Sequence, residues 1–181
     1  MSIPNLLSLL RLVLVPVFAV VFFQPAPDAH RWAVLIYLTA FLTDVADGWI
    51  ARHFNQITKL GRILDPLADK LLVSSAMICF VALPSNPMPA WVVIVIIARE
   101  FIISGFRLVA SDAGVVIAAS YWGKIKTVTQ MIMSILLIVN FDGYIINIVE
   151  YVFIYAALIL TVISLVDYMV KNWSVMRDGN M

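Results

Sequence analysis

Six long apolar runs, separated by short breaks, dominate the hydrophobic pattern of the chain. The runs are Leu6–Phe23, Ala33–Ile50, Ile63–Leu83, Trp91–Val109, Val128–Val139 with its flanks, and Ile145–Val170. A helix crosses a bilayer with roughly 20 apolar residues, so each run predicts a membrane-spanning helix. Turn-forming residues mark three of the breaks, in QPAPDAH, PSNPMP and NFDG. The pattern therefore predicts an all-α integral membrane protein with six transmembrane helices, in which residues 1–181 form a single domain.

The composition supports this prediction. Of the 181 residues, 63% are hydrophobic and 13% are charged, whereas a soluble domain has about 25% charged residues. A soluble core of this chain length could not bury so many apolar side chains. The net charge of +1 gives no reason to expect a nucleic-acid partner, and a single cysteine excludes an internal disulfide.

The distribution of lysine and arginine predicts the orientation, because cytoplasmic loops carry an excess of both. With a cytoplasmic N-terminus, six spans return the C-terminus to the cytoplasm. The cytoplasmic ends then carry Arg11, Arg52, Lys59, Arg62, Lys70, Arg107, Lys124, Lys126, Lys171 and Arg177. The outer breaks carry only Arg31. The polar stretch between the second and third runs is therefore expected at the cytoplasmic face.

That stretch, residues 44–70, carries four aspartates in two pairs. Asp44 and Asp47 are three residues apart, and Asp65 and Asp69 are four apart, so each pair shares one face of a helix. Pro66 is tolerable if it lies in the first turn of its helix. Two antiparallel helices joined by a short turn would bring both pairs together.

Four converging carboxylates repel one another and are costly to bury unless cations bind them. Hard oxygen ligands fit Mg²⁺, Mn²⁺ or Ca²⁺, and two such ions would nearly balance the four charges. Paired divalent ions favour phosphoryl displacement. A solvated charged turn is the alternative, but it does not explain Asp44 and Asp47 just inside an apolar run. For Gly48 and Gly61, close helix packing is the alternative to a role at the site.

The stretch resembles the signature of the CDP-alcohol phosphatidyltransferases, with the spacing D-x2-D-G-x2-A-R-x8-G-x3-D-x3-D. The segments IPNLLSLLRL, AREFIISGFR and GVVIAASYWGKIKTVTQM are similar to those of the branch of bacterial phosphatidylglycerophosphate synthases. The resemblance implies a six-span homodimer in a bacterial cytoplasmic (inner) membrane, with the active site facing the cytoplasm. It also implies transfer of the phosphatidyl group of CDP-diacylglycerol to an alcohol, here glycerol 3-phosphate, with release of CMP.

The resemblance also implies roles for individual residues. Two ions, Mg²⁺ or Mn²⁺, would be bound by Asp44, Asp47, Asp65 and Asp69, with Asp69 as the general base for the incoming hydroxyl. CDP-diacylglycerol would be bound by Gly48, Ala51, Arg52 and Gly61, with Asn5, Thr43 and Thr58 as further candidates.

The phosphate of the acceptor needs cations. Arg99 and Arg107 are eight residues apart, just over two helical turns, so both side chains reach one pocket. Lys124 and Lys126 open the fifth run and are further candidates. The alternatives are pairing of Arg99 with Glu100 or an aspartate, and an anchoring role at the membrane surface for both lysines, above all for Lys126.

Three other functions fit parts of the pattern. Another acceptor, such as inositol phosphate or serine, would preserve the aspartate chemistry, although the paired bases favour a phosphorylated acceptor. A cation or proton transporter would also use acids within spans, usually near the bilayer midplane rather than at one face. A non-catalytic membrane scaffold would leave the aspartates without a function.

Overall fold

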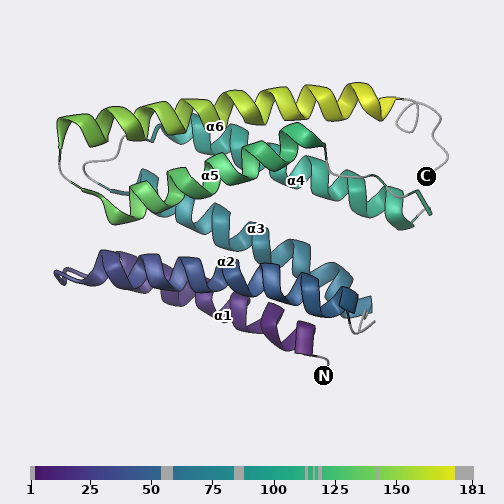
Figure 1. Cartoon of the computed structure of the whole chain (residues 1–181), viewed down its shortest axis with the longest axis horizontal. Helices are drawn as coiled ribbons and strands as arrows, with labels where there is room; N and C mark the ends of the chain where they lie inside the picture. The colour runs from purple at the N-terminus through teal and green to yellow at the C-terminus, as the bar shows by residue number, and fades with distance from the viewer. Residues whose placement is uncertain are drawn as a thin grey trace. The chain divides into compact units, whose positions relative to one another are not determined.

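The described part of the chain forms six α-helices, and each apolar run coincides with one of them. The computed structural model describes residues 3–53, 59–83, 88–112, 114–115, 117, 120–141 and 143–173, with the main chain alone at 3–5, 44–53, 59–66 and 112. Within these residues the helices are α1 (Ile3–Phe22), α2 (Ala29–His53), α3 (Lys59–Val81), α4 (Ala90–Asp112), α5 (Tyr121–Val139) and α6 (Tyr144–Lys171) (Figure 1). No strand occurs in the described part, so the all-α prediction is confirmed there.

Pro66 lies deeper in its helix than the first turn, the position at which sequence analysis considered a proline tolerable. α3 begins at Lys59, which makes Pro66 the eighth residue of the helix. Proline has no amide hydrogen, so the Arg62 carbonyl lacks the helical donor that residue 66 would otherwise supply. The main chain nevertheless stays helical through this position. Both aspartates of the second pair are therefore inside a helix rather than at its start.

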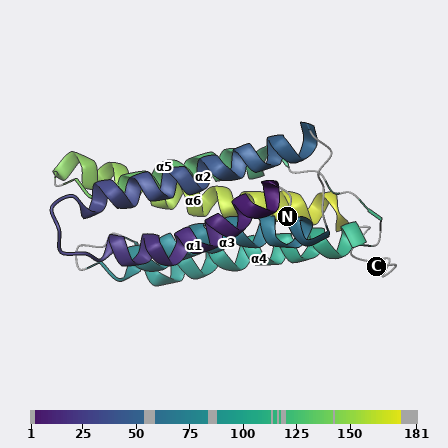
Figure 2. The ribbon, with the colours of Figure 1, turned by 90° about the horizontal axis from the view of Figure 1, so that it is seen from below.

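The helices divide into two compact units. The first contains Met1–Pro84 with Leu137–Asn140, and the second contains Ser85–Leu136 with Phe141–Met181. In the first unit, α1 packs against both α2 and α3, and α2 also contacts α3 (Figures 1 and 2). Its core contains an aromatic group in which Phe22 contacts Phe18 and Phe80, with ring centroids 5.6 and 5.8 Å apart. Tyr37 of α2 joins this group through Phe18.

The second unit is built on contacts of α4 with α5 and α6. α4 packs along α6, and side chains of α4 and α5 pair across their interface. α4 ends, α5 begins and α6 ends on the same side of this unit (Figure 1). The C-terminal half of α4 therefore shares that side with the beginning of α5 and the end of α6.

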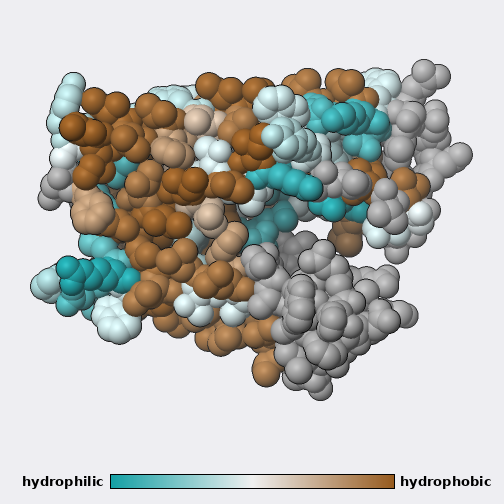
Figure 3. Space-filling view, in the orientation of Figure 1, coloured by the Kyte–Doolittle hydropathy of each residue, from teal (hydrophilic) through white to brown (hydrophobic). Residues whose placement is uncertain are grey.

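The exposed surface of the helices is rich in apolar side chains, most clearly in α6, whose buried stripe includes several polar ones. The buried stripe of α6 is Glu150, Ile154, Ala157, Thr161, Ser164 and Tyr168. Its exposed positions include Val152, Ile159, Val162, Val166 and Val170. Hydrophobic side chains cover much of the visible face of this unit, and hydrophilic ones gather near the end of α6 (Figure 3). A soluble protein would show the reverse arrangement, so this surface is suited to lipid.

Two helices, α5 and α6, have the length and hydropathy that crossing a membrane requires, judged over the described residues. A shorter apolar helical stretch, Leu6–Phe22, lies in α1. The outward apolar faces are not confined to these helices. Val13 of α1, Leu42 of α2, Ile78 of α3 and Ile94 of α4 are all exposed. Each helix thus presents apolar side chains on its outer surface.

Candidate active site

The two aspartate pairs lie at equal distances from the ends of α2 and α3. Asp47 is six residues before the last residue of α2, and Asp65 is six residues after the first residue of α3. At a rise of about 1.5 Å per residue, each lies about 9 Å along its helix. α2 and α3 run in opposite directions and contact each other within the first unit (Figure 1). The main chain therefore places both pairs at a similar level along the two helices.

The helical spacing within each pair also agrees with the sequence prediction. Asp44 and Asp47 lie in continuous α-helix, as do Asp65 and Asp69. The side chains of Asp44, Asp47 and Asp65 are outside the described residues. The predicted convergence of the four carboxylates therefore stays a prediction. The side chains of the expected nucleotide-binding residues Asn5, Ala51 and Arg52 and all of Thr58 are outside the described residues as well. Gly48 and Gly61 have helical main chain.

Asp69 is the one predicted metal ligand whose side chain is described. Its Oδ2 lies 3.9 Å from Nζ of Lys70, which is an ion pair rather than a hydrogen bond. The Asp69 side chain is 39% exposed and that of Lys70 is 13% exposed. The neighbouring Ala68 and Leu72 are buried in the first unit. Asp69 thus lies at the edge of the packed core, where solvent and a substrate can reach it.

A buried arginine supports α2 one turn before the first aspartate. Arg11 of α1 has no exposed surface, and its Nε donates a hydrogen bond to the Ala40 carbonyl oxygen at 3.3 Å. Thr43 donates its hydroxyl to the same oxygen at 2.7 Å. A regular α-helix uses this oxygen to accept the amide of Asp44. Arg11 and Thr43 therefore meet at the carbonyl to which the Asp44 turn is attached.

Sequence analysis placed Arg11 among the charges of the cytoplasmic ends, and its burial was missed. One signal was available, since Arg11 stands within the apolar run Leu6–Phe23. A charged side chain inside such a run is expensive unless it meets a partner within the protein. Arg11 is close to the start of the run, where long basic side chains commonly extend to the membrane surface. The sequence alone therefore favoured a role for Arg11 as a surface anchor.

A second group of charges lies in the second unit, between α4 and α5. Glu100 accepts a hydrogen bond from Nη1 of Arg99 at 2.8 Å, and Nζ of Lys126 forms an ion pair with the same carboxylate oxygen. The side chains of Arg99, Glu100 and Lys126 are 11%, 19% and 2% exposed. This buried triad carries two cations on one carboxylate. Excess positive charge in a low-dielectric place favours the approach of an anion.

The triad changes the interpretation of two predicted phosphate ligands. Arg99 pairs with Glu100, as the alternative from the sequence proposed. Lys126 is almost fully buried, unlike a residue that anchors the helix at the membrane surface. Arg107 and Lys124 are exposed, on the side where α4 ends and α5 begins. Two of the four predicted cations, Arg99 and Lys126, thus meet at Glu100 between α4 and α5, whereas Arg107 and Lys124 are exposed.

The end of α6 completes this part of the unit. Tyr168 is buried and packs edge to face on Phe106 of α4, with ring centroids 5.8 Å apart and an interplanar angle of 87°. The preceding residue, Asp167, pairs with Lys171 at 2.6 Å. Tyr168 was missed by sequence analysis, because a tyrosine near the end of an apolar run is typical of an interfacial belt.

The donor set fits the predicted metal ions by its chemistry. Four carboxylates, with no cysteine or histidine among them, are the ligands that Mg²⁺ and Mn²⁺ prefer. Among the described side chains, which leave out Asp44, Asp47 and Asp65, no group of three His, Cys, Asp or Glu could hold an ion. The Asp69 side chain is 39% exposed, and its contact with Lys70 is an ion pair of 3.9 Å rather than a close hydrogen bond.

Comparison with known proteins gives one consistent result. The sequence model described as CDP-alcohol phosphatidyltransferase matches residues 1–163. A protein of Bacillus subtilis (strain 168) named CDP-diacylglycerol–glycerol-3-phosphate 3-phosphatidyltransferase is 39% identical, over 99% of this chain and 99% of its own length. The proteins of that name from Haemophilus influenzae and Shigella flexneri are 35% and 39% identical. The alignments cover 93% of this chain with 91% and 93% of those relatives.

Proposed function

The chain belongs to the CDP-alcohol phosphatidyltransferase family, and we propose that it transfers the phosphatidyl group of CDP-diacylglycerol to sn-glycerol 3-phosphate. The products are phosphatidylglycerophosphate and CMP. The observation that carries the proposal is near-full-length similarity to relatives whose names state this reaction. The alternative functions within the family differ only in the acceptor, which would be inositol phosphate or serine. The buried cations of α4 and α5 support an acceptor that bears a phosphate.

In the proposed reaction, a hydroxyl of glycerol 3-phosphate attacks the phosphorus that carries diacylglycerol. The new phosphorus–oxygen bond forms as the bond to the CMP oxygen breaks, and CMP leaves with that electron pair. Asp69 accepts the proton of the attacking hydroxyl. Its place at the edge of the core suits this task, since a general base must reach a substrate while staying fixed by its helix.

Asp44, Asp47, Asp65 and Asp69 would hold two divalent ions, Mg²⁺ or Mn²⁺. When bound, such ions polarise phosphate oxygens and neutralise developing charge. The chain's own contribution is placement, because both aspartate pairs belong to continuous helices that contact each other. Arg11 and Thr43 fix the turn of α2 that leads into Asp44. Positioning of this kind accounts for a large share of phosphoryl-transfer catalysis.

The remaining substrate contacts would come from two sets of residues. Gly48, Ala51, Arg52 and Gly61, with Asn5, Thr43 and Thr58, would bind the CDP group of the lipid substrate. Arg99, Arg107, Lys124 and Lys126 would bind the phosphate of glycerol 3-phosphate. Thr43 already donates its hydroxyl to Ala40, so its contact with a nucleotide would use the oxygen lone pairs.

The proposed setting is a bacterial cytoplasmic membrane, which all six helices cross as one domain with both termini in the cytoplasm. The outward apolar side chains on every helix support this setting. The proposed assembly is a homodimer.

Cysteine accessibility would test the topology, with single cysteines introduced into a variant lacking Cys79. Labelling of position 31 from outside intact cells and of position 124 only after permeabilisation is the expected result; the reverse pattern would overturn the orientation.

The reaction is tested directly with purified protein in detergent. CMP release is followed with CDP-diacylglycerol and Mg²⁺, in parallel with glycerol 3-phosphate, inositol phosphate, inositol or serine. Release with glycerol 3-phosphate alone is expected. Release with a different acceptor would preserve the aspartate chemistry and change the acceptor. The absence of release with every acceptor would overturn the proposed function.

A further inference from the structure

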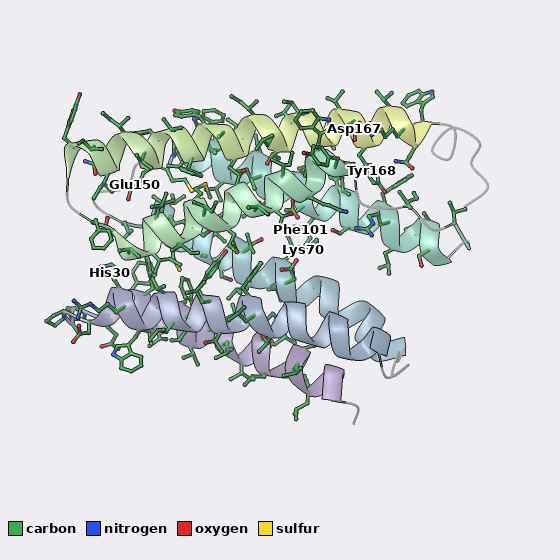
Figure 4. All side chains as sticks on the ribbon, viewed as in Figure 1. His30, Lys70, Phe101, Glu150, Asp167 and Tyr168 are labelled. Carbon is green, nitrogen blue, oxygen red and sulfur yellow. The ribbon has the colours of Figure 1, made fainter. Side chains whose placement is uncertain are left out.

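Tyr168 is a buried polar residue for which the proposed function so far has no use. It lies in the last turn of α6, beyond residue 163, where the match to the family ends. It is 5% exposed, and its ring is fixed by the edge-to-face contact with Phe106. Figure 4 shows Tyr168 and Asp167 together near the C-terminal end of α6, with Glu150 near the other end. The side chain is thus held firmly at the end of the unit where Arg107 and Lys124 are found.

The hydroxyl of Tyr168 has no hydrogen-bond partner among the described residues, although it is buried. Nε of Arg99 is also buried and also has no hydrogen-bond partner in the described part of the chain. A buried polar group without a partner is unfavourable, and such groups are uncommon in folded proteins. Two of them occur here, one on α4 and one on α6, and these helices pack along each other with Phe106 of α4 against the Tyr168 ring.

The chemistry of these groups specifies the kind of ligand that would satisfy both. A guanidinium can only donate hydrogen bonds, and a phenol hydroxyl can donate one as well. The missing partner is therefore an acceptor. Because the surrounding cations outnumber the carboxylates, an anion is favoured over a neutral acceptor. A phosphate group offers several strong acceptor oxygens to such a set of donors.

We propose that the Tyr168 hydroxyl donates a hydrogen bond to the phosphate of the acceptor substrate, together with Nε of Arg99 and the guanidinium of Arg107. The inference rests on the proposed function and adds α6 to the acceptor site, which otherwise consists of α4 and α5. Tyr168 is a binding residue in this scheme, because the phosphate it contacts is not the one that reacts. Its loss weakens binding of glycerol 3-phosphate and leaves the chemical step and the lipid substrate unaffected.

The test uses Tyr168→Phe, which keeps the ring against Phe106 and removes only the hydroxyl. Tyr155→Phe is the matched control, since Tyr155 is on the same helix but is exposed. A hydrogen bond to a charged group predicts a rise of about 10-fold or more in KM for glycerol 3-phosphate. KM for CDP-diacylglycerol and kcat are expected to stay within about 2-fold of wild type. The lost hydrogen bond stabilises the bound acceptor equally in the ground state and in the transition state, so only acceptor binding is weakened.

A second measurement separates phosphate binding from the kinetics. Inorganic phosphate should inhibit wild type in competition with glycerol 3-phosphate, and its inhibition constant should rise in Tyr168→Phe by a factor similar to the KM. Tyr155→Phe should match wild type in both measurements. The thermal unfolding midpoint of Tyr168→Phe in detergent is expected to be no lower than that of Tyr155→Phe, since the removed hydroxyl has no partner in the described structure.

The outcomes distinguish the two proposals. If wild type releases no CMP with glycerol 3-phosphate, the proposed function fails. If wild type is active and Tyr168→Phe leaves KM and the phosphate inhibition constant unchanged, the proposed function stands and the Tyr168 inference is overturned. An equal rise in KM for both substrates, or a marked fall in the unfolding midpoint, would also overturn it, because the hydroxyl would then support the fold rather than the acceptor phosphate.

Discussion

Arg11 of α1 and Ala40 of α2 are joined by a hydrogen bond of 3.3 Å from the guanidinium Nε to the main-chain oxygen, and both residues are fully buried. This contact ties the first helix to the turn that precedes Asp44. A cation buried for such a contact is costly, so its value lies in fixing one helix relative to another. Because Asp44 and Asp47 belong to α2, their main chain is fixed relative to α1 as well.

Arg11→Ala is therefore expected to destabilise the protein and to reduce turnover. Removing the guanidinium leaves one donor fewer on the Ala40 oxygen and opens space between α1 and α2, at a cost of about 2 kcal/mol. Thermal unfolding in detergent measures the first effect, and CMP release measures the second. Arg31→Ala is the matched control, because Arg31 pairs only with Asp28 on the exposed surface of the described structure. An Arg11→Ala protein as stable and active as Arg31→Ala would contradict the role given to this contact.

Glu100→Gln tests the buried triad. The amide would leave Arg99 and Lys126 close together without a balancing charge, and breaking a buried ion pair costs about 3–5 kcal/mol. The expected result is a lower unfolding midpoint and a higher KM for glycerol 3-phosphate, since Arg99 would lose the partner that orients it. Glu150→Gln is the control, because Glu150 is buried, whereas Glu100 is 19% exposed, and the Oε1 of Glu150 has no hydrogen-bond partner in the described residues. Similar behaviour of the two variants would show that Glu100 does not organise the cations.

Asp69→Asn should abolish turnover and leave binding of CDP-diacylglycerol largely intact. Asparagine keeps the shape of the side chain but cannot accept the proton of the attacking hydroxyl at neutral pH. The measurements are CMP release and retention of the lipid substrate on immobilised protein. Asp28→Asn provides the control, since that aspartate lies in the exposed break between α1 and α2. Turnover by Asp69→Asn near the wild-type rate would remove Asp69 from the role of base.

Chelation tests the metal proposal. Addition of EDTA should stop CMP release, and excess Mg²⁺ or Mn²⁺ should restore it, because the four aspartates would otherwise repel one another and the phosphates. The activity is measured before chelation, after it and after each ion is added back. Ca²⁺ serves as a comparison ion that also takes oxygen ligands but has a larger and more flexible coordination shell. Turnover that continues unchanged in EDTA would contradict a metal-dependent reaction.

The sequence predicted the helices well because their physical cause is local. Each apolar run is long enough to define a helix, and α1 to α6 follow the six runs. The helical spacing of Asp44 with Asp47 was predictable for the same reason. The inward direction of Arg11 and Lys126 was not, because charge near the end of a span indicates a surface anchor equally well. Their burial depends on Ala40 and Glu100, which are distant in sequence.

Tyr168 illustrates the same limit more strongly. Its position near the end of α6 gives the pattern of an interfacial tyrosine, and Tyr151 and Tyr155 on the same helix are indeed exposed. Only the packing of α4 along α6 brings its ring onto Phe106 and buries its hydroxyl. For Pro66 the sequence stated only a condition, tolerance in a first turn, and the main chain stays helical although Pro66 is the eighth residue of α3.

The outward apolar surface of α6 has a calorimetric consequence. Val152, Ile159 and Val166 face away from the core, so in the proposed membrane they contact acyl chains both before and after the helices separate. Unfolding within a bilayer would then expose little apolar area to water, and the associated heat-capacity increment would be small. The thermal stability curve should accordingly be nearly straight, and cooling would not weaken the fold in the way that it weakens a water-soluble domain of the same length.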